Sequence, residues 1–143
     1  MAKINSFDEE IENHLKELDL KEKELRIIAK QLSAKRVKSF DKLSKEIVSN
    51  LSELGMAEAL FEVRHTLSDN LNEYGLDEIT FLFSANKGFS PIELNKSASG
   101  GELSRLMLTI KSILSKSTDI SSILFDEIDT GVSGDVADKM GSI

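Results

Sequence analysis

The first 54 residues contain neither glycine nor proline, and this constrains the fold more than any other feature of the chain. The segment is rich in Lys, Glu and Leu, which favour helix. Apolar residues recur at spacings of three and four in a heptad pattern, at Ile4, Phe7, Ile11, Leu18, Leu25, Ile28 and Leu32. The pattern resumes one position out of phase at Phe40, Leu43, Ile47, Leu51 and Leu54, as a skip in a long coil would do. We predict a coiled-coil arm over residues 1–54, about 80 Å long at about 1.5 Å per residue.

The alternative is two amphipathic helices broken near residue 35, where Lys35, Arg36 and Lys38 interrupt the apolar seam. No turn residue marks such a break, so one helix is favoured. A single arm leaves its seam uncovered, which predicts a partner helix outside the chain or in a second copy. We expect self-association through residues 4–54.

Residues 55–143 show the pattern of a small α/β lobe. Alternation with period two predicts strands over 61–65 and 79–83, with 67–77 as their connection. Residues 86–95 are expected to form a loop or a short irregular edge, and residues 101–116 an amphipathic helix. A buried strand over 123–125 and a last helix after Gly134 complete the prediction. The expected domains are therefore a coiled-coil arm, 1–54, and an α/β lobe, 55–143.

Charge and composition exclude several classes of protein. The net charge is −7, and residues 55–143 carry all of it, with 14 acidic and 7 basic side chains. Because phosphate neutralisation needs Lys and Arg, this lobe is not expected to be the main DNA-contacting surface. No apolar run approaches the roughly 18 residues that span a bilayer, so no membrane association is expected. The absence of cysteine and of a secretory signal favours a cytoplasmic protein.

A glycine-rich turn opens the predicted helix at residue 101. In Ser99-Gly100-Gly101-Glu102 the glycines let an anion approach backbone N–H groups at the positive end of the helix dipole. A serine hydroxyl beside them can donate to a phosphate oxygen. The same four residues match the Ser-x-x-Glu capping box, which only closes a helix start. Phosphate binding and capping both stay open at this point.

An apolar strand that ends in two carboxylates follows that helix. Ile123-Leu124-Phe125 is followed directly by Asp126 and Glu127. One carboxylate at such a strand end can hold Mg²⁺ while the second orients or deprotonates a water molecule. An acidic pair that ends a strand is also common on ordinary protein surfaces. The pair alone leaves both interpretations open.

Taken in order, these elements resemble the C-terminal half of an ABC-type ATPase head. Ala98-Ser99-Gly100-Gly101-Glu102 is similar to the signature motif of that family, residues 123–127 to its Walker B strand, and Thr130-Gly131-Val132-Ser133 to its D-loop. A helical arm that leads directly into this half resembles the SMC-like branch. The strings at residues 81–86, 98–105 and 125–134 resemble the RecN family of bacterial DNA repair proteins.

The resemblance implies an ATPase that acts in DNA double-strand-break repair and recombination, with ATP and Mg²⁺ bound between the heads of a homodimer. Asp126 would serve Mg²⁺, and Glu127 the hydrolytic water. The nucleotide of the opposite head would be contacted by Ser99, Gly100, Gly101 and Glu102. The D-loop would be formed by Thr130, Gly131, Val132 and Ser133. The implied location is cytoplasmic, in association with the nucleoid.

No Gly-x-x-x-x-Gly-Lys-Ser/Thr string occurs in the chain. The phosphate-binding loop would therefore come from an N-terminal half outside it, and DNA contact would belong to the full-length protein. Because the sequence stops inside the last predicted helix, we expect a fragment that alone neither binds ATP tightly nor hydrolyses it. The alternative is a non-enzymatic coiled-coil interaction module with a small α/β cap, in which the turn and the acids are structural.

Overall fold

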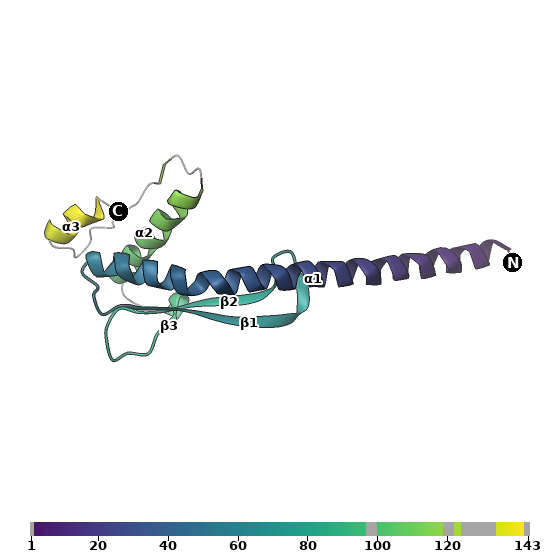
Figure 1. Ribbon diagram of the computed structural model, residues 1–143, viewed down its shortest axis with the longest axis horizontal. Helices are drawn as coiled ribbons and strands as arrows, with labels where there is room; N and C mark the ends of the chain where they lie inside the picture. The colour runs from purple at the N-terminus through teal and green to yellow at the C-terminus, as the bar shows by residue number, and fades with distance from the viewer. Residues whose placement is uncertain (1, 97–99, 119–121, 124–133, 142–143) are drawn as a thin grey trace. The chain divides into compact units, whose positions relative to one another are not determined.

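The computed structural model describes residues 2–96, 100–118, 122–123 and 134–141 (Figure 1). Its elements are α1 (Ala2–Glu53), β1 (Leu60–Asn72), β2 (Gly75–Ser84), β3 (Ile92–Glu93), the 3-10 turn η1 (Leu94–Lys96), α2 (Gly100–Ser117) and α3 (Gly134–Met140). The strands form one sheet in the order β1-β2-β3. The predicted combination of helix and sheet is confirmed. Within these ranges, no helix has the length and apolar character needed to cross a bilayer.

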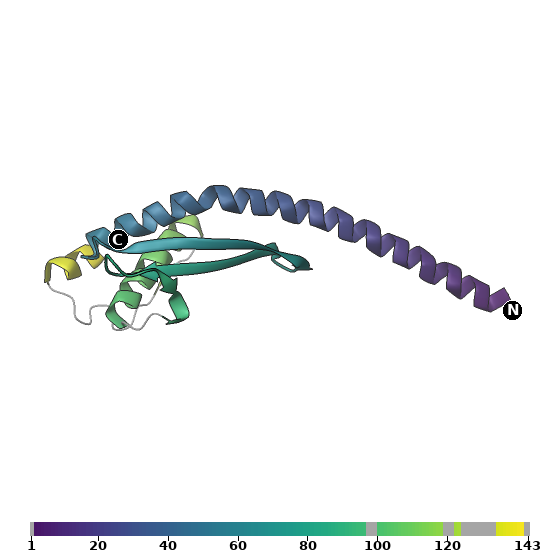
Figure 2. The same cartoon turned by 90° about the horizontal axis from the view of Figure 1, so that it is seen from below.

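Helix α1 is continuous, as Figures 1 and 2 both show. It runs without interruption through Lys35, Arg36 and Lys38, where the apolar seam is broken. The prediction of one long helix is therefore confirmed, and the alternative of two helices broken near residue 35 is wrong. It contains no glycine or proline and is rich in Lys, Glu and Leu, so a local change in apolar pattern does not end the helix.

The chain packs as two compact units, and the boundary between them crosses α1 and both long strands. Unit 1 consists of Met1–Lys38 and Thr66–Glu78, and unit 2 of Ser39–His65 and Ile79–Ile143. The division predicted after residue 54 coincides with the end of α1 and not with a boundary between these two units. The assignment of these segments to an arm and a head lobe stays a prediction.

The core of unit 2 joins the second part of α1 to the sheet and to α2. Its members are buried and apolar: Ile47, Leu51, Met56, Ala59, Phe61, Phe83 and Leu106. A smaller cluster brings together Leu54 from the turn that follows α1, Leu108 from the middle of α2 and Met140 from the end of α3. The out-of-phase apolar positions after residue 39 thus pack inside unit 2. The change of phase in the apolar pattern therefore marks the part of α1 that packs into the core of unit 2, and it is not a skip within an exposed coiled coil.

Strands β1 and β2 form a hairpin that is longer than predicted. They include the expected segments 61–65 and 79–83 but extend to Asn72 and back from Gly75, so the expected connection over 67–77 is wrong. The turn is only two residues, and the Asn72 side chain closes it by accepting a hydrogen bond from the Tyr74 amide at 2.8 Å. Gly75 follows with a φ of 103°, which side-chain-bearing residues rarely adopt. At the opposite end, β3 pairs antiparallel with β2 through Leu82 and Phe83, as expected for a short edge.

In unit 1, two arginines of α1 hold the tip of this hairpin. Arg36 donates to the Tyr74 carbonyl at 2.8 Å and to the Asp77 carboxylate at 2.6 Å. The Asp77 side chain is only 1% exposed, so this ion pair is largely shielded from water. Nearly three turns earlier in the helix, Arg26 donates to the Asp69 carbonyl at 3.0 Å. We call this set of contacts the hairpin clasp.

The two C-terminal helices begin close to where the sequence predicts them. Helix α2 covers the predicted residues 101–116 with one more at each end, and α3 begins at Gly134. Both predictions are confirmed. Ile123 has no regular secondary structure, and the rest of the strand predicted over 123–125 lies outside the described residues.

Candidate functional site

The first turn of α2 is open to a ligand. The helix begins at Gly100, and the first N–H groups of a helix have no acceptor within it. Among the residues that the structure describes, none lies within 4 Å of a Cβ atom built on Gly100, so none of them fills the space beside the backbone there. The Ser104 hydroxyl donates to the Gly100 carbonyl at 2.9 Å, a hydrogen bond within the first turn that stabilises it. The N-terminus of α2 is also the positive end of the helix dipole.

The body of α2 is fixed by burial. Leu106 is fully buried in the core of unit 2, and Leu103 and Ile110 pack against the same cluster. These three residues recur at spacings of three and four, which places them on one face of the helix. Burial of this face holds the first turn of α2 in a defined position beside the sheet.

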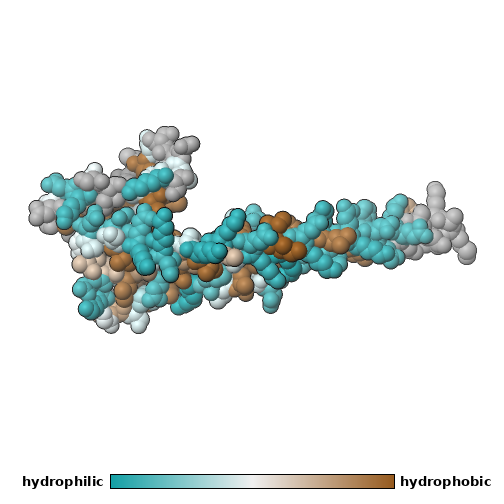
Figure 3. All heavy atoms as spheres, viewed as in Figure 1, coloured by the Kyte–Doolittle hydropathy of each residue, from teal (hydrophilic) through white to brown (hydrophobic). Residues whose placement is uncertain are grey.

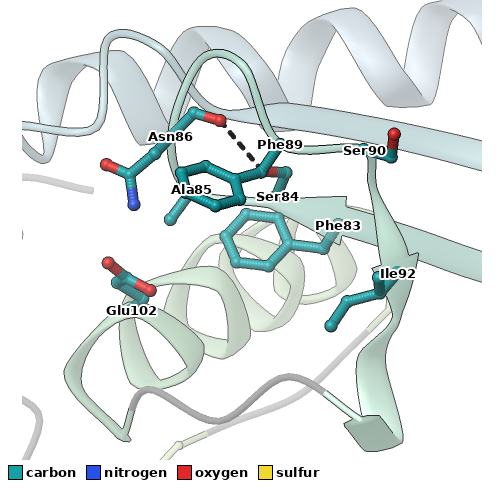
Figure 4. Close-up of a pocket in the computed structure, with 8 residues that line it drawn as sticks. All are labelled: Phe83, Ser84, Ala85, Asn86, Phe89, Ser90, Ile92 and Glu102. Carbon is teal, nitrogen blue, oxygen red and sulfur yellow. Dashed lines mark hydrogen bonds between the residues drawn. The ribbon is translucent and has the colours of Figure 1, made fainter.

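A pocket of about 260 Å³ lies beside this first turn (Figure 4). Phe83, which is 1% exposed, contributes a ring to its lining, whereas the nearby Phe89 is 70% exposed. Polar groups come from Ser84, Asn86, Ser90 and Glu102, and the remaining lining residues are Ala85 and Ile92. In Figure 4 the Glu102 carboxylate rises from α2 on the same side of the pocket as the Asn86 amide.

The polar groups of the pocket differ in how they are held. The Ser84 hydroxyl donates to the Asn86 carbonyl at 3.0 Å, which fixes the start of the loop after β2. The Glu102 carboxylate makes no hydrogen bond or ion pair with another described residue.

The structure places only part of the predicted site. Gly100, Gly101 and Glu102 lie together in the first turn of α2. Outside the described residues lie Ser99, Asp126, Glu127, Thr130, Gly131, Val132 and Ser133. Among the side chains that are described, no three His, Asp or Glu residues gather closely enough to hold a metal ion. The predicted roles of these residues toward Mg²⁺ and water stay predictions.

Several features of unit 2 were not predicted from the sequence. Asn86, Phe89 and Ser90 line the pocket. The signal for Phe89 and Ser90 was the turn-like composition of 86–95, and Asn86 also ends the string at residues 81–86. On α2, the Nε atom of Arg105 and the Oγ1 atom of Thr109 are buried without a hydrogen-bond partner among the described residues. No local pattern distinguishes these two residues from ordinary helix positions.

Glu93, at the end of β3, is a carboxylate whose pKa is lowered by its neighbours. The hydrogen bond from Lys96, whose Nζ atom lies 3.0 Å from the carboxylate, lowers the pKa of Glu93, and the positive charge of Lys96 adds to the effect. Arg64 lies at 4.0 Å and acts in the same direction on this pKa. The cations therefore hold Glu93 in its ionised form and link η1 to β3.

Curated relatives match almost the whole chain. The DNA repair protein RecN of Bacillus subtilis is 41% identical over 149 residues, which is 94% of this chain and 26% of the relative. RecN of Rickettsia bellii is 40% identical over 145 residues, 99% of this chain and 26% of the relative. RecN of Vibrio cholerae is 34% identical over 144 residues, 100% of this chain and 26% of the relative. The chain thus spans about a quarter of the length of these relatives, and no family model matches it.

Proposed function

Because the chain belongs to the RecN family of DNA repair proteins, we propose that it forms the signature-motif part of an ABC-type ATPase head. The whole protein would bind and hydrolyse ATP with Mg²⁺ at a head–head interface while it acts in DNA double-strand-break repair. The observation that carries this proposal is the open first turn of α2, which begins at Gly100 with free space beside its backbone. We also propose that the protein is located in the cytoplasm, in association with the nucleoid.

The proposed contact with nucleotide is made across the dimer. Ser99, Gly100 and Gly101 would receive the γ-phosphate of ATP held by the opposite head, and Glu102 would lie beside it. Unpaired N–H groups at a helix start suit a phosphate, and the missing Cβ at Gly100 allows its close approach. Because phosphoryl transfer depends mainly on positioning and charge neutralisation, a site divided between two heads makes nucleotide binding and dimer closure one event.

The acidic pair would supply the chemistry within its own head. Asp126 would hold Mg²⁺, and Glu127 would orient the attacking water and accept its proton. Thr130, Gly131, Val132 and Ser133 would reach across the interface as the D-loop. Their support is the order of the motifs along the chain and the family membership.

The test is ATP-dependent dimerisation of a full-length RecN-type protein that carries these residues. Gly100→Asp places a negative side chain in the open space, so the variant should fold normally yet lose ATP-induced head dimerisation. Its affinity for ATP in the monomer should stay unchanged, because the affected contact is made across the dimer. Sedimentation with and without ATP and Mg²⁺ measures the first property, and fluorescent-nucleotide titration the second.

Asn13→Asp is the matched control, because it adds the same charge at an exposed position of α1 far along the chain from the motif. Glu127→Gln should bind ATP and accumulate as the closed dimer. Unchanged ATP-induced dimerisation of Gly100→Asp would contradict the contact proposed across the interface. Absence of any ATP-induced dimerisation in the unsubstituted protein would favour the non-enzymatic interaction module, in which the diglycine turn only starts a helix.

A further inference from the structure

The loop that joins β2 to β3 presents an aromatic ring at the pocket beside α2. Phe89 is 70% exposed, whereas Phe83, which lines the same pocket, is 1% exposed. Figure 3 shows brown apolar side chains that reach the surface of unit 2 among teal polar ones. A large exposed ring beside a pocket offers a flat apolar face on which a planar ligand can stack.

Both ends of this loop are anchored, so the ring is held in place by the sheet. The Ser84 hydroxyl donates to the Asn86 carbonyl at 3.0 Å, and Ile92 pairs with Phe83 across β3 and β2. Between these anchors Gly88 has a φ of 92°, which favours glycine and permits a tight turn. The amide of Asn86 and the ring of Phe89 consequently line one pocket.

The pocket combines an aromatic side with a polar side. Figure 4 shows the rings of Phe83 and Phe89 on one side, and the Asn86 amide with the Glu102 carboxylate on the other. An amide both donates and accepts hydrogen bonds, whereas an ionised carboxylate only accepts them. A ligand that suits both sides has a planar ring and an amino group next to a ring acceptor.

The size and the place of the pocket indicate one ring system of a larger ligand. Its volume of about 260 Å³ lies below the range of about 300–1,000 Å³ that is typical of sites for whole drug-sized ligands. Glu102 lines the pocket and also belongs to the first turn of α2, where the proposed function places the γ-phosphate of ATP. The base of the same nucleotide is covalently attached to that phosphate chain, and adenine carries an amino group next to a ring acceptor.

We propose that the pocket receives the adenine of the ATP held by the opposite head, so that the closed dimer recognises the base as well as the phosphates. This inference rests on the proposed function and adds a base-specific subsite to it. The Asn86 amide would accept from the N6 amino group of adenine and donate to N7, while Phe89 stacks on the face of the ring. The Glu102 carboxylate favours a donor at the same edge of the base.

Inosine triphosphate is the matched probe for this contact. Its base carries a carbonyl acceptor at position 6, where adenine carries the amino donor. N7 is an acceptor in both bases, so the Asn86 amide cannot form its two-bond pairing with hypoxanthine. The Glu102 carboxylate would also meet an acceptor in place of a donor.

The test measures nucleotide-induced head dimerisation of a full-length RecN-type protein that carries these residues, in the Glu127→Gln background and with saturating nucleotide. ATP should give a dimer about tenfold tighter than inosine triphosphate does, and Asn86→Ala should remove this preference. Phe89→Ser should weaken dimerisation about tenfold with both nucleotides, because stacking on an aromatic ring tolerates any base. Phe89→Tyr keeps the ring and should retain tight dimerisation.

Two variants outside the pocket serve as matched controls. Tyr74→Ser removes another highly exposed ring, which is 68% exposed, and Asn13→Ala removes another exposed amide. Neither should change dimerisation with either nucleotide. The affinity of the monomer for ATP should stay unchanged in Phe89→Ser and Asn86→Ala, because the pocket contacts the nucleotide of the opposite head. Fluorescent-nucleotide titration measures this affinity.

The outcomes separate this inference from the proposed function. If Gly100→Asp prevents ATP-induced dimerisation while Phe89→Ser behaves like Tyr74→Ser, the proposed function stands and the base subsite is wrong. An equal response to the two nucleotides, in the unsubstituted pocket and in Asn86→Ala alike, would also overturn the subsite. If ATP produces no dimer of the protein with an unsubstituted pocket, the proposed function fails and this inference fails with it.

Discussion

At the scale of single residues, Glu93 shows how one cation sets the ionisation of one carboxylate. Lys96 lowers the pKa of Glu93 from its ordinary value of 4.5 by a hydrogen bond and by its charge. A lowered folded-state pKa stabilises the fold above the unfolded pKa, and this contribution disappears as the pH falls through the folded pKa. The contribution of Glu93 should therefore be lost on acidification below about pH 4.5.

We expect Lys96→Gln to raise the pKa of Glu93 toward its ordinary value, as followed by NMR titration of the Glu93 carboxyl carbon. Lys87→Gln is the matched control, because the Lys87 ammonium lies 3.7 Å from Glu58 and belongs to another exposed pair. The same Glu93 pKa in both variants would show that Lys96 is not the dominant cause.

Single residues also show where sequence reasoning about the candidate site ends. The diglycine at residues 100–101 predicts a helix start, and α2 begins at Gly100, because the signal is local. The pocket beside it depends on Phe89 and Asn86 in the loop after β2 coming near Glu102. That approach is decided by packing of β2 and α2 on a shared core, which no short sequence pattern encodes.

At the scale of elements, the helices follow from the sequence, whereas the length of the hairpin does not. Continuous helix propensity and apolar spacing predict α1 and α2 within a few residues. Asp69 and Asn70 are poor strand formers, so propensity favours a turn where β1 continues. The clasp supplies the missing stabilisation through hydrogen bonds from Arg26 to Asp69, 43 positions away, and from Arg36 to Asp77, 41 positions away.

We expect Arg36→Ala to destabilise the hairpin tip by about 2–4 kcal/mol, because it leaves the shielded Asp77 carboxylate without this cation. Hydrogen exchange of the β1 and β2 amides near the turn measures the local effect. Arg26→Ala is the matched control and should cost about 1 kcal/mol or less, because its contacts are exposed. Equal losses in the two variants would contradict a special role for the Arg36–Asp77 pair.

At the scale of the whole molecule, the division into two units could not be predicted from the sequence. Composition changes at Gly55, which suggests a boundary there, but unit 1 combines the first part of α1 with the hairpin tip. This combination depends on the clasp, whose members are distant in sequence. The family membership, in contrast, follows from short motifs and from overall identity to longer relatives.

We expect this chain alone to release no phosphate from ATP above background, because it contains no phosphate-binding loop with its lysine. A sensitive phosphate-release assay on the purified chain measures this, with Glu127→Gln as the comparison. Turnover that disappears in Glu127→Gln would contradict the expectation and place a complete site within these 143 residues.

The junction after α1 has a mechanical consequence. Gly55 takes a φ of 79°, and a Cβ built there would lie 3.3 Å from Val136 in α3. Leu54 is fully buried against Met140 of the same helix. Because glycine has no side chain, α3 can approach the backbone at the end of α1 this closely within unit 2. Any other residue at position 55 would have to adopt a rarely populated backbone conformation and would also displace Val136, so the seating of α3 depends on this single hydrogen in place of a Cβ atom.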